Sequence, residues 1–191
     1  MITGLTIAIT LVAAAMSGPG QVRAASGLKQ CPPEGSNAVN FSAYHLGDSF
    51  SGHALTETLR VCNKPHPPER VRGNYISYIY GDCTPGTDSG CAPPVEVQSA
   101  PACERPKPSR RIRRRARTHK LRGVPAVQFR GEARIELFTG DATVLIFGRT
   151  PIEVRRAARA LRSIPGSPVS VPPQVRLPRP LRGALTGTLR C

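Results

Sequence analysis

A run of positive charge between residues 105 and 122 limits where this 191-residue chain can build a core. Ten of its eighteen residues are Arg or Lys, and its only bulky apolar side chains are Ile112 and Leu121. Such a run repels itself and stays extended or loosely helical unless a polyanion neutralises it. We therefore expect residues 105–122 to form a solvated basic linker with folded segments on both sides.

The two sides of this linker differ strongly in charge. Residues 1–103 hold six basic and seven acidic residues, whereas residues 104–191 hold 21 basic and five acidic residues. The net charge of +15 therefore comes entirely from the second half. Heavy use of Arg, Ala, Pro and Gly is also typical of GC-rich genomes, so codon bias explains part of the charge without a selected function.

The N-terminus has the pattern of a secretory signal. Residues 2–16 are mostly apolar, helix-breaking residues follow, and the small residues Val22 and Ala24 fit a cleavage site after Ala24. We expect a signal peptide at 1–24 and a secreted or cell-surface-associated protein. The alternative is a buried or membrane-bound N-terminal helix. No stretch of the chain reaches the roughly 18 apolar residues of a membrane span.

Six cysteines agree with export, because disulfides persist in oxidising compartments. The disulfide candidates are Cys31, Cys62, Cys83, Cys91, Cys103 and Cys191. Their pairing is open, although turn-forming residues between Cys83 and Cys91 favour a local bridge. A bridge at Cys191, the last residue, would pin the C-terminus. Because the cysteines and histidines lack zinc-ligand spacing, we expect no metal and no cofactor.

Residues 25–104 are expected to form a cysteine-rich β segment. Apolar residues alternate in 54–61, residues 76–80 are β-branched or aromatic, and 94–98 is a shorter candidate strand. Both of the last two candidates end near cysteines. Disulfides at these ends would join neighbouring strands.

The second half contains the clearest secondary structure. Residues 124–129, 134–138 and 142–147 have the composition of strands, and a turn at 139–141 joins the last two. The order β-β-β followed by a helix predicts that the helix packs on one face of a small antiparallel sheet. The expected fold is therefore α+β, stapled by disulfides, with long irregular segments.

The helix is expected at 151–163. Thr150, Pro151 and Glu153 form the pattern of a capping box with proline at the first helical position. An apolar stripe follows at helical spacing, formed by Val154, Ala157, Ala158, Leu161 and Ile164. The opposite side carries Arg155, Arg156, Arg159 and Arg162.

Residues 123–191 are thus expected to be a β-β-β-α unit with a Pro-rich tail. The tail from 167 to 180 is an extended connector, and 185–191 is a candidate last strand tied by Cys191. This unit either stands alone or shares one domain with residues 25–104.

Six short motifs are spread over the expected mature chain. They are Ile79-Tyr80-Gly81-Asp82-Cys83, Gly90-Cys91-Ala92-Pro93-Pro94, Val97-Gln98, Pro101-Ala102-Cys103, Arg122-Gly123-Val124-Pro125-Ala126 and Leu189-Arg190-Cys191. In these motifs the chain resembles a group of small exported proteins of high-GC Gram-positive bacteria with no assigned function. The resemblance implies an exported protein with a shared cysteine plan, but no chemistry. The basic run is not a feature of that group.

Three patterns have a catalytic interpretation and a structural one. Gly47-Asp48-Ser49 resembles the motif of serine esterases, where a late Asp-x-x-His pair activates the serine, but the last histidine here is His119, with Ala116 three residues before it. The segment Thr87-Asp88-Ser89-Gly90 is interpreted as a disulfide-flanked turn. Glu132 and Glu136 alternate with arginines and are interpreted as the solvated face of a strand.

We therefore expect a protein without catalytic activity that associates electrostatically with anionic cell-wall polymers or a membrane surface. The candidate anion-binding residues are Arg110, Arg111, Arg113, Arg114, Arg115 and Arg117, together with the Arg side of the helix. Without interleaved aromatic residues or a recognition helix, sequence-specific nucleic-acid binding is not expected. The alternatives are a small serine hydrolase centred on Ser49, a basic run that is only a spacer, and a structural or protein-interaction module with the Pro-rich tail as a ligand.

Overall fold

The computed structural model describes residues 39–62, 74–82, 92–104, 116–165, 167–168 and 170–191. Most of these residues belong to one eight-stranded antiparallel sheet. Its strands, in spatial order, are β2 (Ser49–Phe50), β3 (His53–Cys62), β4 (Asn74–Tyr80), β5 (Val95–Pro101), β9 (Ala142–Gly148), β8 (Arg134–Thr139), β7 (Val124–Phe129) and β6 (Ala116–Leu121). This sheet and one α-helix confirm the α+β fold, with a larger sheet than the sequence predicted.

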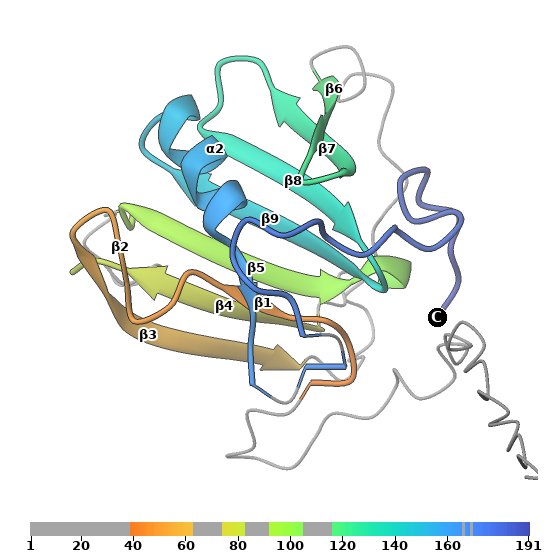
Figure 1. The fold of residues 1–191 in the computed structure, drawn as a ribbon, viewed down its shortest axis with the longest axis horizontal. Coiled ribbons are helices and arrows are strands. Elements are labelled where there is room, and N and C mark those ends of the chain that lie inside the picture. The colour runs from red at the N-terminus through yellow and green to blue at the C-terminus, as the bar shows by residue number, and fades with distance from the viewer. Residues whose placement is uncertain (1–38, 63–73, 83–91, 105–115, 166, 169) are drawn as a thin grey trace, which may run out of the picture.

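The sheet consists of two four-stranded meanders, one from each half of the sequence. Strands β2 to β5 form the N-terminal meander, and strands β6 to β9 form the C-terminal meander. The two meet where β5 pairs with β9 over seven residue pairs, from Val95↔Gly148 to Pro101↔Ala142. Figure 1 shows β3 and β6 at opposite edges of the joined sheet. The near-neutral and the strongly basic halves of the chain therefore share one sheet.

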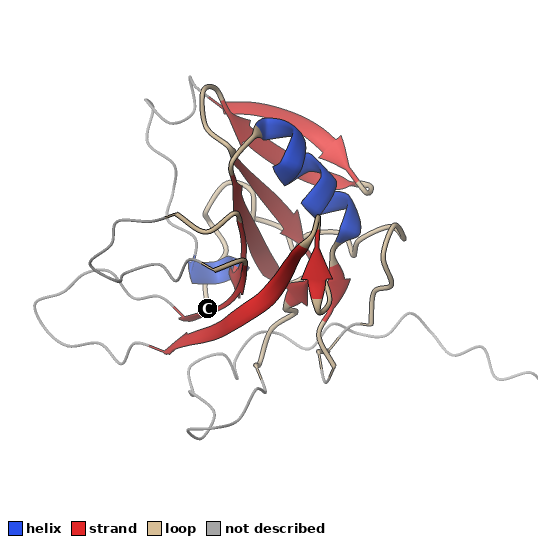
Figure 2. Ribbon diagram, turned by 90° about the vertical axis from the view of Figure 1, so that its left-hand side faces the viewer, coloured by secondary structure: helices blue, strands red, loops and turns tan. Residues whose placement is uncertain are grey.

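Helix α2 (Pro151–Ala160) packs on the C-terminal meander, against β8 and β9 (Figure 2). Its residues Val154, Ala157 and Ala158 are fully buried in one cluster with Ile135 of β8 and Ile146 of β9. We call the face of the sheet that carries these residues the helix face. The helix begins as predicted, because the backbone N–H of Glu153 donates to Thr150 Oγ1 at 3.1 Å.

The helix ends three residues earlier than the predicted range of 151–163. Leu161 has an extended backbone, and Arg162–Ser163 form the short strand β10, which pairs with β1 (Tyr44–His45). Leu161 and Ile164 are nevertheless buried. The apolar pattern thus predicted their burial correctly, but the pairing of β10 with β1 replaced the last helical turn.

A mostly irregular segment, residues 39–46, which includes the two-residue strand β1, covers the helix face of the N-terminal meander. The backbone N–H of Tyr44 donates to Ser99 Oγ at 3.0 Å, and that of Leu46 donates to the Tyr80 hydroxyl at 2.7 Å. The Tyr80 hydroxyl in turn donates to the carbonyl of Gly47 at 3.1 Å. Because buried backbone groups require partners, these two sheet side chains allow a non-helical segment to lie on the core.

Two tight turns close the hairpins at the edges of the sheet. Ser51-Gly52 joins β2 to β3 and Arg122-Gly123 joins β6 to β7, with positive φ at all four residues. Two-residue turns of this type match the twist of the flanking strands. The prediction that the whole of residues 105–122 is a solvated linker is wrong for residues 116–121, which form β6. There the backbone pairs with β7, while the charged side chains extend from the two faces of this edge strand.

The C-terminal tail is docked rather than free. Leu177 N–H donates to the Arg122 carbonyl at 3.0 Å, and the N–H groups of Gly140 and Leu181 donate to the carbonyls of Pro178 and Gly140. Val171, Leu177 and Ala184 are buried. The predicted strand at 185–191 is wrong: residues 182–187 form successive turns, with positive φ at Gly183 and Gly187.

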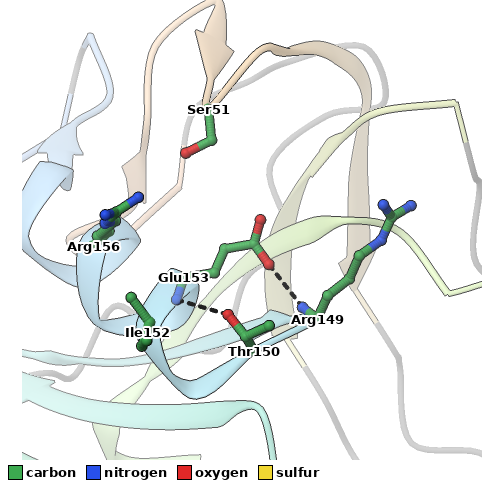
Figure 3. A pocket seen from close by; sticks show the side chains of 6 residues that line it. All are labelled: Ser51, Arg149, Thr150, Ile152, Glu153 and Arg156. Carbon is green, nitrogen blue, oxygen red and sulfur yellow. Dashed lines mark hydrogen bonds between the residues drawn. The ribbon is translucent and has the colours of Figure 1, made fainter.

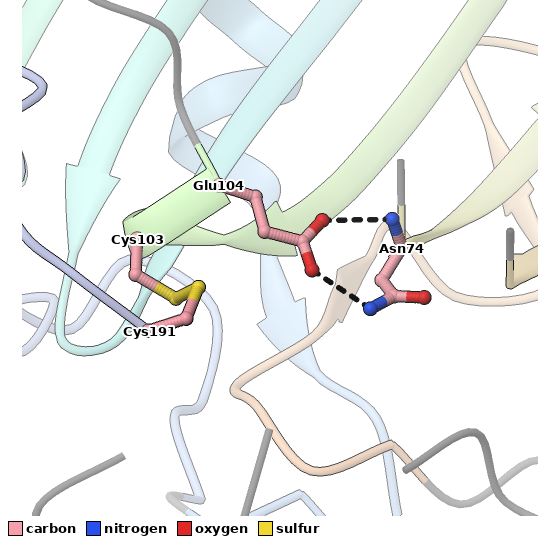
Figure 4. Close-up of a disulfide and its surroundings, with 4 residues drawn as sticks. All are labelled: Asn74, Cys103, Glu104 and Cys191. Atoms are coloured by element: carbon pink, nitrogen blue, oxygen red, sulfur yellow. Dashed lines mark hydrogen bonds between the residues drawn. A yellow bond between two sulfur atoms is a disulfide. The ribbon is translucent and has the colours of Figure 1, made fainter. Parts of the chain in front are cut away.

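A disulfide between Cys103 and Cys191 fixes the end of the tail (Figure 4). Cys103 lies in the short 3-10 helix η1 (Ala102–Glu104) that follows β5. The carboxylate of Glu104 accepts hydrogen bonds from the backbone and the side chain of Asn74 at 2.8 and 2.7 Å. The bridge and these bonds hold the end of the chain, the end of β5 and the start of β4 together.

Several sequence predictions lie outside the described residues. They are the signal peptide at 1–24, the cysteines Cys31, Cys83 and Cys91, the turn at Ser89, and the part of the basic run before residue 116. For Cys62 the structure describes only the backbone at the end of β3. Within the described part of the chain, no helix is long and apolar enough to cross a membrane.

Candidate anion-binding site

Strand β6 places part of the basic run on the helix face. Arg117 pairs with Gln128 of β7, and His119 pairs with Ala126. Paired residues share a face of the sheet, and Gln128 and Ala126 are themselves paired with the helix-face residues of β8. Arg117 and His119 therefore project toward the side of the sheet where α2 lies, whereas Thr118 and Lys120 project from the opposite face.

Helix α2 adds two arginines to the same region. Arg155 Nη1 donates a hydrogen bond to Gln128 Oε1 at 3.1 Å, which holds its guanidinium beside the residue paired with Arg117. Arg159 follows four residues later, on the same side of the helix. We call Arg117, His119, Arg155 and Arg159 the basic surface. The spacing is about 6 Å between the two helix residues and about 7 Å between the two strand residues.

The acidic residues nearest to this region in sequence are already engaged or lie on the other face. Glu132 forms an ion pair with Arg134 at 3.0 Å, and Glu153 caps the start of α2 by accepting from the backbone N–H of Arg149 at 2.9 Å. Glu136 points away from the helix. Within the described part of the chain, none of the four side chains of the basic surface forms an ion pair. The charges of the three arginines are therefore available to an external anion.

Arg122, the last residue of the predicted basic run, has a structural position instead. Its guanidinium donates to the carbonyls of Leu161, Pro172 and Val175, so that one side chain ties the end of the helix to the tail. Burial lowers the pKa of Arg122, and the nearby Tyr44 acts in the opposite direction. With its donors occupied by carbonyls, Arg122 holds the fold together and is not part of the basic surface.

Of the six predicted anion-binding residues, the structure describes only Arg117, which is exposed. The other five, Arg110, Arg111, Arg113, Arg114 and Arg115, lie outside the described residues. The predicted Arg side of the helix is divided. Arg155 and Arg159 belong to the basic surface, Arg156 lines a pocket at the start of α2, and Arg162 lies in β10.

That pocket has a volume of about 290 Å³ and lies between the turn at Ser51 and the start of α2. Figure 3 shows Arg149 and Arg156 extending to opposite sides, with the Glu153 carboxylate between them. Because Glu153 brings a negative charge into this pocket, the pocket is not a second anion-binding site like the basic surface.

The structure describes Ser49 and Glu136, which belong to two of the three catalytic interpretations. Ser49 is exposed at the start of a hairpin, and no described histidine hydrogen-bonds to its hydroxyl. The expectation that Glu136 lies on a solvated strand face is wrong, because this side chain is only 7% exposed on the face opposite the helix. That face also buries Val127, Phe129 and Phe138. No group of three or more potential metal ligands occurs among the described residues.

Sequence reasoning missed the structural roles of three residues in the sheet and its turns. Gln128 links the helix to β6, Arg122 clamps the tail, and the buried Glu96 accepts hydrogen bonds from Ser77 Oγ at 2.5 Å and Gln98 Nε2 at 2.7 Å. Only the turn at Arg122 had a signal in the sequence. Arg122-Gly123, placed directly before a predicted strand, has the position of a hairpin turn and implies a partner strand at 116–121.

Comparison with protein-family models, with curated proteins and with solved structures finds no match to this chain. The resemblance to small exported proteins therefore stays a prediction. The case for a function depends on the geometry of the described residues and on the sequence of the run that precedes β6.

Proposed function

We propose that this is an exported, non-catalytic protein that binds anionic polymers or lipid headgroups of the cell envelope. The basic surface and the preceding run, residues 105–115, would provide the positive charge. One observation carries the proposal: the hydrogen bond from Arg155 to Gln128 brings helix and strand charges onto one surface. Residues of β6, the described part of the basic run, share this side of the sheet with arginines of a separate helix, an arrangement that a spacer alone would not require.

The chemistry of the side chains suits this role. Arginine keeps its charge at physiological pH and presents a planar set of donors that match the oxygens of phosphate and carboxylate groups. Each basic residue near an anionic surface contributes about 1 kcal/mol, an attraction that salt screens. The Cys103–Cys191 disulfide is compatible with an exported protein.

The surface can be tested apart from the run by changing Arg117 and Arg155 to Ser together. Binding to heparin and to vesicles of anionic phospholipid should weaken about thirtyfold at low salt, because two charges of about 1 kcal/mol each near the ligand are lost. The matched control changes Arg182 and Arg190 to Ser, which removes the same charge from exposed positions in the tail. An equal loss in both variants would mean that only net charge matters and would contradict a defined surface.

The run is tested by changing Arg110, Arg111, Arg113, Arg114 and Arg115 to Ser. For the parent protein, polyanion affinity should fall about a thousandfold between about 50 and 200 mM salt if six or so charges are neutralised. The variant should bind weakly and show a shallower salt dependence. If it binds heparin as tightly as the parent at every salt concentration, the run is a spacer and this part of the proposal is wrong.

A further inference from the structure

Helix α2 runs beside strand β6 in the same direction, because side chains join the two elements near both ends. Near the start of β6, Arg155 of the helix donates to Gln128, which is the β7 partner of Arg117. Directly after β6, Arg122 donates to the carbonyl of Leu161, the first residue beyond the helix. The basic surface therefore follows the length of β6, with strand residues along one side and helix residues along the other.

The C-terminal tail crosses the far end of this surface. The backbone N–H of Gln174 donates to the carbonyl of Arg159 at 3.3 Å. Two residues later, Arg176 lies against the turn after β6, where a Cβ atom added to Gly123 would be 2.7 Å from Arg176 Cγ. Arg176 is exposed, and its guanidinium has no ion pair or hydrogen bond within the described part of the chain. The tail thus adds a positive charge where the basic surface ends.

The dimensions of this extended surface suit a chain of phosphates. From Arg117 to the turn at Gly123 the surface is about 15–20 Å long, and Arg155 and Arg159 are about 6 Å apart along it. Successive phosphates of an extended phosphodiester chain lie a similar distance apart as these two helix residues. The surface is therefore long enough for about four phosphates in a row.

We propose that the basic surface together with Arg176 binds one linear phosphodiester polymer, which runs along β6 from Arg117 to the docked tail. This inference rests on the proposed function and narrows its ligand from envelope anions in general to a chain of phosphates. The guanidiniums contact phosphate oxygens through paired donors, and an N–H of His119 donates a further hydrogen bond. Contacts to phosphates carry no information about the sugars or bases between them.

The arrangement of charge favours a single polymer over a membrane. A membrane presents headgroups over a plane, so every exposed arginine on that side of the protein would contribute about equally. Beside the line of the basic surface the charge is mixed. The tail continues past Arg179 to the turn between β8 and β9, where Gly140 bonds to Pro178 and Leu181, and this turn also carries Asp141. A line of cations beside an acidic residue is complementary to one anionic chain.

The test compares two arginines of the tail in the full chain at low salt. The probe is a fluorescent abasic oligomer of eight sugar phosphates, and anisotropy measures its binding. Arg176→Ser should weaken binding about fivefold, the effect of one charge next to a polyanion. The matched control Arg179→Ser removes the same charge from an exposed tail residue beside the line and should weaken binding less than about twofold. Equal losses in the two variants would overturn the proposal.

The length of the probe provides a second measurement. The run variant described above is used for it, so that residues 105–115 do not bind the longer probes. Affinity should rise steeply from two to four phosphates and only slightly from four to eight. An equally steep rise between four and eight phosphates would overturn the proposal, because the surface would then have no defined length.

Vesicles of phosphatidylglycerol separate a polymer from a membrane as the ligand. Because a plane of headgroups does not distinguish the two tail positions, Arg176→Ser and Arg179→Ser should weaken vesicle binding equally. A larger loss for Arg176→Ser on vesicles than on the oligomer would assign the surface to a membrane and overturn the proposal. If changing Arg117 and Arg155 weakens binding while the two tail variants remain equal on the oligomer, the proposed function stands and this inference fails.

Discussion

The two meanders bury the same face of one sheet in different ways. An amphipathic helix covers the C-terminal meander and satisfies its own backbone hydrogen bonds, so the sheet beneath it is aliphatic at Ile135, Leu137 and Ile146. The irregular segment 39–46 covers the N-terminal meander, and the sheet there presents the polar groups of Tyr80 and Ser99. The cover therefore determines the chemistry of the sheet: an irregular segment requires buried polar side chains beneath it, whereas a helix does not.

The disulfide should have the largest effect, because it links the end of the N-terminal meander covalently to the C-terminal tail. Changing both Cys103 and Cys191 to Ser releases a link between residues 88 positions apart. The unfolding free energy should fall by about 4.5 kcal/mol in the chain-entropy model. Denaturant unfolding followed by circular dichroism measures it. If the two meanders unfold separately once the bridge is removed, the variant should unfold in two steps. An unchanged unfolding midpoint would show that the bridge does not stabilise the contact between them.

The helix-covered meander should be sensitive to the loss of apolar volume. Leu161 is fully buried directly after the helix, so Leu161→Ala should cost about 2–4 kcal/mol in unfolding free energy. Ile152→Ala, at a helix position that is 59% exposed, is the control and should cost less than about 0.5 kcal/mol. Equal costs in thermal or denaturant unfolding would mean that the helix does not pack as described.

The contact between the helix end and the tail depends on one guanidinium. Arg122→Ala removes three hydrogen bonds to carbonyls and should lower the unfolding free energy by about 2 kcal/mol. Arg122→Lys keeps the charge but cannot reach three carbonyls, so it should restore only part of that loss. The control Arg117→Ala removes an equal charge from the exposed strand and should leave stability nearly unchanged. A full rescue by Lys would mean that charge, not the clamp, is what matters.

The meander under the irregular segment should depend on a hydroxyl group. Tyr80→Phe removes the acceptor of the Leu46 N–H and the donor to the Gly47 carbonyl, at a cost of about 1–2 kcal/mol in unfolding free energy. Burial raises the pKa of Tyr80 to about 12, so the hydroxyl stays protonated at physiological pH. Tyr78→Phe is the matched control, because Tyr78 is also buried but forms no hydrogen bond through its hydroxyl to a described residue. Similar costs for both would contradict the role given to Tyr80.

The smallest effect should come from His45, where the irregular segment pairs with β10. Burial and the positive charge of Arg162 lower the pKa of His45, against the opposite pull of Asp48 and a hydrogen bond with the backbone of Ser163. The unfolded chain therefore binds a proton at a higher pH than the folded chain. Stability should fall as the pH drops below about 6.5, the ordinary pKa of histidine.

This pH dependence is measured as the difference between the parent and His45→Gln. The parent should lose more stability than the variant between about pH 7.5 and 5, because only the parent must protonate a histidine in an unfavourable place. Arg162→Ala should raise the pKa of His45 in an NMR titration. A measured pKa at or above the ordinary value in the parent would overturn this prediction.

Local patterns predicted the C-terminal meander better than its surroundings. The strands at 124–129, 134–138 and 142–147 and the cap at Thr150 were predicted within about a residue, because alternation, turn residues and capping are encoded in neighbouring positions. The end of α2 was not, since it depends on β10 pairing with a strand more than a hundred residues earlier. The joining of β5 to β9 is likewise a long-range contact that no local pattern specifies.

The candidate site was only partly accessible to sequence reasoning. Charge density pointed to Arg117, but β6 has no apolar alternation, so this segment was predicted as linker. The position of Arg155 beside Gln128 depends on how the helix crosses the sheet, and the clamp by Arg122 depends on carbonyls of a distant tail. The partners of Arg122 are backbone carbonyls, which every residue has. The sequence of the tail therefore does not indicate that Arg122 contacts it.

The junction of β5 and β9 has a consequence for the continuity of the chain. Each meander is contiguous in sequence, and residues 105–115 are the only covalent backbone connection between them. A protease that cut there would leave two fragments, held together by the seven residue pairs of β5 and β9, by the pairing of β1 with β10 and by the Cys103–Cys191 bridge. The contact between the two meanders is therefore an internal interface. If the backbone between them were cut, forming this interface would become the association of two polypeptides instead of a step in the folding of one chain.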